Sequence, residues 1–158
     1  MSGLTGQTGP ENRANRECVA RRGQSRKITM CAQLLSFEEL ECWKAGRDLR
    51  QFLSREVLPR LPKEERYRLG DQIMRAARSV TANVAEGYGR NHYLDNAKFC
   101  RNALGSCYEV LDHLLCAHDE RWISDQLLED ARQKAGVTAK LINGYIRYLR
   151  TAAETQGR

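Results

Sequence analysis

Basic side chains without acidic neighbours are the most distinctive chemical feature of the C-terminal part of the chain. Residues 131–150 contain five lysine and arginine residues and no aspartate or glutamate. At about 100° per residue on a helix, four of these cations share one face with Asn143: Arg132, Lys140, Arg147 and Arg150. A row of cations can follow a phosphate backbone. A solvated face near the negative end of the helix dipole is the alternative, but the missing acidic partners favour phosphate binding.

A polar stripe is expected on the second predicted helix, in the middle of the chain. It consists of Gln72, Arg75, Ser79, Asn83, Glu86 and Arg90. Polar groups beside a core must be hydrogen-bonded or hydrated, so three interpretations stay open: a contact between subunits, a polar network within the protein, or a binding groove. A further group of cations is expected where the second and third helices meet and is our second choice for nucleic-acid binding: Arg75, Arg78, Arg90, Lys98 and Arg101.

Catalytic and metal-binding patterns are weak. Cys116 and His118 are ligand types, but residues two apart on a helix point in different directions and cannot close on one ion. Glu86 and Glu109 stand on different helices, where two carboxylates are more often structural partners of arginine or members of a polar network or oligomer interface. Among six cysteines there is no C-x-x-C pair, so we expect reduced thiols in a cytoplasmic protein. We therefore predict no enzymatic activity, no cofactor, no metal and no small-molecule substrate.

The apolar pattern predicts four helices. A capping box, Ser36-Phe37-Glu38-Glu39, opens the first helix, which should stop before Pro59. Pro62 should open the second, which Gly87 and Gly89 end. A third is expected over residues 95–118, and a fourth begins after Ser124. Two sets of apolar residues should face inward from the last two helices: Cys100, Ala103, Leu104, Cys107, Leu111, Leu114 and Leu115 in the third, and Leu128, Ala131, Ala135, Thr138, Ile142, Tyr145 and Leu149 in the fourth.

These elements predict an all-α fold, an up-down-up-down antiparallel four-helix bundle over residues 36–153. Residues 1–35 hold six basic and two acidic residues and no sustained periodicity, so we expect a disordered basic tail there. Residues 154–158 are expected to form a disordered C-terminus. No apolar run approaches the length needed to cross a bilayer, and the N-terminus lacks a signal-peptide core. We therefore expect a cytoplasmic protein with no membrane partner.

Three segments carry a family resemblance. The central one is DQIMRAARSVTANVAEG at residues 71–87, and it is accompanied by FEELECWKA at residues 37–45 and FCRNALGSCYE at residues 99–109. Together they resemble the four-helix-bundle proteins encoded in 23S rRNA intervening sequences. Relatives of that family include the accessory variability determinant of diversity-generating retroelements. The match covers about residues 36–150, and Cys107-Tyr108 departs from the usual apolar or small residues at that place.

The resemblance implies a homopentameric barrel with a basic surface and no known enzymatic activity. In the retroelement setting it implies binding to a reverse transcriptase and its template RNA, in support of mutagenic cDNA synthesis. The expected partners are therefore RNA or an RNA/DNA hybrid, a reverse transcriptase and further copies of the chain. The alternative is a structural protein–protein scaffold encoded by an rRNA intervening sequence, with no direct role on nucleic acid.

Overall fold

The computed structural model describes residues 36–90 and 92–156. Within these ranges the chain is helical and contains no strand. The α-helices are α1 (Glu41–Phe52), α2 (Leu69–Gly89), α3 (Tyr93–Asp119) and α4 (Asp125–Gln156). The predicted disordered tail at residues 1–35 lies outside the described residues, and so do residues 157–158.

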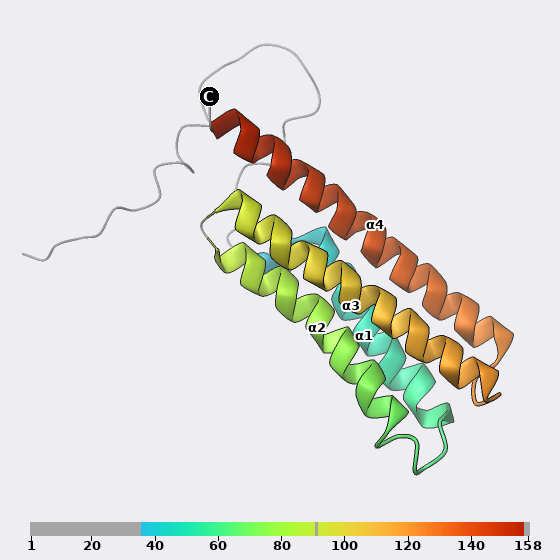
Figure 1. Ribbon diagram of the computed structural model, residues 1–158. Helices are drawn as coiled ribbons and strands as arrows, with labels where there is room; N and C mark the ends of the chain where they lie inside the picture. Colours follow the sequence, from blue (N-terminus) through green and yellow to red (C-terminus); the bar gives the residue numbers. More distant parts are fainter. Residues whose placement is uncertain (1–35, 91, 157–158) are drawn as a thin grey trace, which may run out of the picture. The chain divides into compact units, whose positions relative to one another are not determined.

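The helices pack as the predicted antiparallel bundle. α2 lies against α3, α3 lies against α4, and α1 contacts both α2 and α4 (Figure 1). Each helix buries one apolar side, and the largest wholly buried side chains come from all four helices. They include Leu49, Ile73, Leu114, Ile142 and Leu149. The all-α four-helix bundle is therefore confirmed.

The first helix differs from its prediction at both ends. The Ser36 hydroxyl accepts the Glu38 N–H at 3.3 Å, which confirms Ser36 as a cap, but it caps a short 3₁₀ turn, η3 (Phe37–Glu39), and not the α-helix. The α-helix begins only after Leu40, whose backbone is extended. At the other end, a π-helical turn, η4 (Leu53–Val57), and a 3₁₀ turn, η5 (Leu58–Arg60), follow α1. The wider turn keeps Leu53 and Val57 wholly buried.

The second helix begins later than predicted. Pro62 opens a series of turns instead, in which the Glu65 and Arg66 N–H groups both donate to the Pro62 carbonyl at 3.0 Å. α2 starts at Leu69. The Arg66 guanidinium holds this link by donating to the carbonyls of Leu61 at 3.1 Å and Pro59 at 2.9 Å. Burial of Leu61, which is 1% exposed, competes with helix formation here and delays it.

The remaining boundaries agree more closely with the sequence. α2 ends at Gly89, although Gly87 lies inside the helix and is buried. The Ser124 hydroxyl accepts the Leu127 N–H at 3.3 Å, as expected of a cap. α4 runs to Gln156, so the predicted end of the bundle at residue 153 is wrong for residues 154–156.

The inward-facing residues of α3 and α4 are largely the predicted ones. Leu115 is an exception, because it is 38% exposed. Ile146 is buried although it was not predicted to be, while Tyr145 is only partly buried. Among the described residues, no helix is long and apolar enough to cross a membrane.

Candidate nucleic-acid interface

The predicted cationic face of α4 points to solvent. Lys140, Arg147 and Arg150 are all exposed. Among the described residues, none of these three takes part in a salt bridge, whereas Arg132 lies 3.9 Å from Glu129. Three of the four predicted cations are therefore available to an external anion.

The fifth cation of α4 has a packing role. The Lys134 ammonium lies 2.6 Å from a carboxylate oxygen of Asp48 and 5.3 Å from the centre of the Phe52 ring. Both partners belong to α1, so Lys134 joins α1 to α4. Helical spacing turns Lys134 away from the other four cations, and this position allows the contact with α1.

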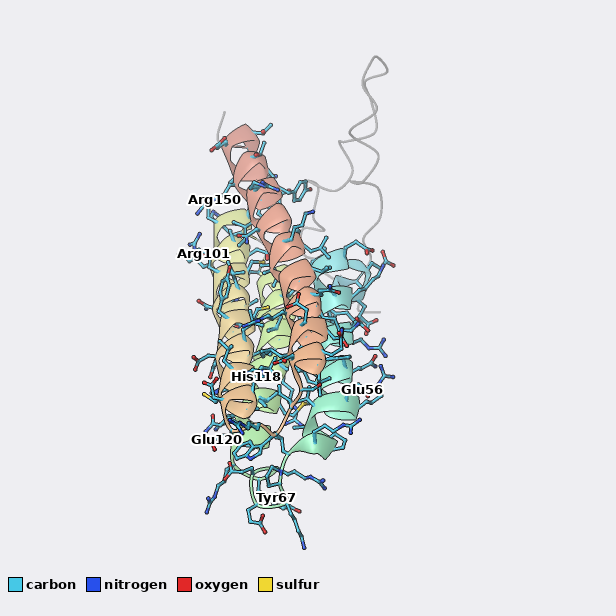
Figure 2. All side chains as sticks on the ribbon, turned by 90° about the vertical axis from the view of Figure 1, so that its right-hand side faces the viewer. Glu56, Tyr67, Arg101, His118, Glu120 and Arg150 are labelled. Carbon is cyan, nitrogen blue, oxygen red and sulfur yellow. The ribbon has the colours of Figure 1, made fainter. Side chains whose placement is uncertain are left out.

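Arg101 of α3 lies at the level of the cationic face of α4, because of the way the two helices are aligned. The Asn96 amide donates to the Tyr145 hydroxyl at 3.1 Å, and the Cys107 thiol donates to the Ala135 carbonyl at 3.4 Å. Between these two contacts, antiparallel helices place Arg101 at the level of Lys140. Figure 2 shows Arg101 and Arg150 on the same side of the bundle. Arg101 is exposed and forms no salt bridge within the described part of the chain.

The other cations of the second predicted group are spread along the bundle. Twelve residues separate Arg78 from Arg90 on α2, which is about 18 Å at the helical rise. Most of this group is paired locally: Arg75 with Asp71 at 3.3 Å, Arg90 with Glu86 at 2.6 Å, and Lys98 with Asp95 at 3.1 Å. These five cations therefore do not form the single cluster that was expected.

The centre of the polar stripe on α2 is a network within the bundle. The Ser79 and Ser106 hydroxyls lie 2.8 Å apart, which links α2 to α3. The Asn83 amide donates to the Ser79 carbonyl at 2.9 Å and to its hydroxyl at 3.0 Å. At one end of the stripe, Gln72 accepts from Arg75 on the surface. Of the three interpretations, the network within the protein describes Ser79 and Asn83.

The two glutamates that the sequence places on different helices, Glu86 and Glu109, are exposed. The side chains of Glu86 and Glu109 are 51% and 54% exposed. Glu86 pairs with Arg90, as expected of a structural partner of arginine, but Glu109 lies 3.7 Å from His113 Nε2.

Three thiols lie in the core. Burial raises the pKa of Cys42 to about 11, that of Cys100 to about 12 and that of Cys107 to about 11. The thiolate is the reactive form of cysteine, so these groups are poor nucleophiles and poor metal ligands near neutral pH. Cys116 is exposed. In residues 36–90 and 92–156, no three His, Cys, Asp or Glu side chains are placed to hold a metal ion.

The sequence reasoning missed a buried polar contact. Asn96 is 5% exposed, donates to Tyr145 from α3, and accepts from the Cys100 thiol at 3.4 Å. Burial raises the pKa of the Tyr145 hydroxyl, while the hydrogen bond from Asn96 lowers it. The signal available in the sequence was the spacing of Asn96, which stands four residues ahead of Cys100 and therefore on the apolar side of the helix. This contact sets the register that brings Arg101 to the level of Lys140.

The fold and the cationic face of α4 define a class of protein: a helical bundle whose candidate site is a charged outer surface. The chain belongs to the family of 23S rRNA-intervening sequence proteins, whose model matches residues 38–144. A solved structure of a protein of unknown function from the S23 ribosomal protein family of Bacteroides thetaiotaomicron is similar in fold. It is 21% identical, with a TM-score of 0.51, over 68% of this chain and 93% of that one. The search of curated proteins found no significant match to the chain.

Proposed function

We propose that this protein is a non-enzymatic, homo-oligomeric accessory protein that binds RNA, or an RNA/DNA hybrid, by charge. The observation that supports the proposal is a set of exposed cations on one side of the bundle that form no salt bridge within residues 36–90 and 92–156: Arg101, Lys140, Arg147 and Arg150. Cations of this kind release counterions from a phosphate backbone and bind with little dependence on sequence. A catalytic role would require converging groups of matched pKa, which an exposed face of arginines does not supply.

The proposal includes a reverse transcriptase as the protein partner. It rests on the resemblance of residues 71–87 to the 23S rRNA intervening-sequence proteins, whose relatives include the accessory variability determinant of diversity-generating retroelements. In that role the bundle would hold template RNA close to the polymerase during mutagenic cDNA synthesis. Co-purification of the tagged chain with the reverse transcriptase of its own gene neighbourhood tests this part, and a neighbourhood without such a gene would contradict it.

Assembly into an oligomer, which we propose to be a pentamer, would multiply weak phosphate contacts. Exposed apolar side chains on α3 and α4 offer surface for contact between copies: Tyr108 is 57% exposed, Val137 54% and Tyr148 48%. A Cβ added at Gly105 or Gly144 would meet no atom within 4 Å, so a neighbouring helix could approach closely there. Light scattering at micromolar concentration should report an oligomer, and a monomer at all concentrations would contradict the assembly.

The alternative function is a protein–protein scaffold with no direct role on nucleic acid. The same exposed apolar residues favour it, because a surface of this kind can serve any protein partner. The two functions differ in one respect that can be measured. A scaffold binds its partner equally well after the cationic face has been neutralised.

Neutralising that face is the experiment that tests RNA binding. Its four predicted cations are replaced together by glutamine, which is nearly as good a helix former: Arg132→Gln, Lys140→Gln, Arg147→Gln and Arg150→Gln. Helicity should be unchanged, and RNA affinity should fall by at least tenfold in low salt. Unchanged affinity would favour the scaffold.

A matched control removes the same number of charges elsewhere on the bundle. Four exposed cations on or near α1 form no salt bridge within the described residues: Arg47, Arg55, Arg60 and Lys63. Their replacement by glutamine lowers the net charge by the same amount and should reduce RNA affinity far less. Equal losses in both variants would mean that net charge, and not this face, governs binding.

A further inference from the structure

The charges on the face formed by α3 and α4 are separated along the bundle axis. Residues 109–132 contain seven acidic and two basic residues, whereas residues 93–108 and 135–153 together contain five basic residues and one acidic residue, Asp95. The contact between Cys107 and Ala135 marks the level at which the two helices cross from one region to the other. Because α3 and α4 are antiparallel, residues 109–132 form one end of the face, which we call the acidic end. The opposite end, from Lys98 and Arg101 to Lys140 and Arg150, is the basic end.

The acidic end is open to solvent. Six of its seven carboxylates belong to exposed residues: Glu109, Asp112, Asp119, Glu120, Asp125 and Glu129. The Asp125 side chain is 99% exposed and lies 2.6 Å from His118 Nε2. Exposed carboxylates repel phosphates over a Debye length, about 8 Å at physiological ionic strength. This end therefore disfavours a nucleic-acid strand.

Arg132 illustrates the separation within a single helix face. It shares the angular position of Arg150 on α4, yet it stands at the acidic end and lies 3.9 Å from Glu129. Arg150 has no acidic partner among the described residues. Helical spacing makes these two arginines equivalent, whereas their surroundings make them different.

We infer that the RNA is held at the basic end of this face and does not continue along α4 into the acidic end. This inference rests on the proposed function and names the form of RNA that fits the site: a short stretch of strand, held at a few phosphates. Ten residues separate Lys140 from Arg150, which is about 15 Å of helix. At about 3.4 Å per phosphate of a duplex strand, that length accommodates roughly four phosphates. A strand continuing along α4 would enter the acidic end and be repelled.

The sharpest test compares single substitutions on the same face of the same helix. Arg147→Gln at the basic end should lower RNA affinity several-fold in low salt. Arg132→Gln, its counterpart at the acidic end, should leave RNA affinity unchanged within error. Both variants keep helix propensity and lose one charge, so they control for each other. Equal losses would overturn the inference and mean that the strand follows the helix.

A second variant removes the acidic end without touching the basic one. Asp112→Asn, Asp119→Asn and Glu129→Gln together should raise RNA affinity several-fold, and Arg132→Gln should become costly in that background. The matched control replaces three exposed glutamates away from this face, Glu38, Glu39 and Glu64, and should change affinity much less. An acidic-end variant that behaves like its control would overturn the inference while leaving RNA binding intact. Failure of the wild-type protein to bind any RNA would overturn the proposed function as well.

Discussion

Arg121 occupies a position at which helices most often carry glycine. It follows the C-cap of α3 with φ at 60°, in the left-handed region. Its N–H donates to the His118 carbonyl at 2.8 Å, and the Trp122 N–H donates to the Ala117 carbonyl at 3.0 Å, which together form a Schellman motif. An L-residue with a Cβ costs about 1–2 kcal/mol in this conformation.

Replacing Arg121 by glycine should therefore stabilise the protein. Part of the gain is offset by the entropy of glycine in the unfolded chain, so we expect the free energy of unfolding to rise by about 0.5–1 kcal/mol. Urea denaturation measures the change. Arg121→Lys retains the strained Cβ and should show no gain, and a loss of stability in Arg121→Gly would mean that the guanidinium makes an important contact.

The buried thiols predict a pattern of chemical reactivity. With Cys18 and Cys31 replaced by serine, a thiol reagent at neutral pH should modify Cys116 rapidly. Cys42, Cys100 and Cys107 should react only on the timescale of unfolding, because burial raises their pKa values and excludes the reagent. Mass spectrometry of the labelled peptides at successive times distinguishes the four sites. Rapid labelling of Cys100 would contradict the packing around it.

The same thiols predict loss of stability at alkaline pH. Their pKa values in the folded protein, about 11 to 12, lie above the ordinary value of 9.0. A group whose folded pKa is raised stabilises the protein fully below its unfolded pKa and loses that contribution as pH rises through the folded value. The urea midpoint should thus be constant from about pH 7 to pH 9 and fall above it. Replacing Cys100 by alanine should make the fall shallower, and an unchanged pH profile would contradict this cause.

At the scale of the elements, Gly87 is required by the close approach of α2 and α3. A Cβ at this position would lie 2.7 Å from Asn96 Oδ1 and 2.9 Å from Phe99 Cβ. Overpacking of this kind costs about 1–3 kcal/mol, so Gly87→Ala should lower the melting temperature. Gly136→Ala is the matched control, because nothing lies within 4 Å of its added Cβ, and it should stabilise α4 by up to about 1 kcal/mol through helix propensity. A neutral Gly87→Ala would mean that the two helices can separate without cost.

The elements also show where sequence reasoning succeeds and where it stops. Most of the seam of α4, from Leu128 to Ile142 and again at Leu149, was predicted correctly, because steps of three and four keep these residues on one side of the helix, but Ile146 was missed and Tyr145 is only partly buried. The start of α2 was predicted wrongly, since the proline signal at Pro62 is local, whereas the burial of Leu61 depends on the packing of the whole bundle. Gly87 was read as a helix stop for the same reason: its neighbours Asn96 and Phe99 are supplied by another helix.

At the scale of the whole molecule, only part of the candidate site could be predicted from the sequence. Spacing alone placed Lys140, Arg147 and Arg150 on one face of a helix. It could not show that Arg101 stands at the same level, because that depends on the contact between Asn96 and Tyr145. It also treated Arg132 as equivalent to the others, although the neighbouring acidic end changes its surroundings. Position on a helix follows from periodicity, while the charge around a residue follows from how helices are paired.

The salt dependence of RNA binding tests the central claim most directly. For single strands, the logarithm of affinity falls by about 0.7 for each neutralised phosphate per tenfold rise in salt. The four cations of the basic end that form no salt bridge among the described residues, Arg101, Lys140, Arg147 and Arg150, therefore predict a slope of about −3 for each bound protomer. The variant in which Arg132, Lys140, Arg147 and Arg150 are glutamine should bind more weakly, with a slope shallower by about 2. Equal slopes and equal affinities for the wild-type protein and this variant would contradict the account.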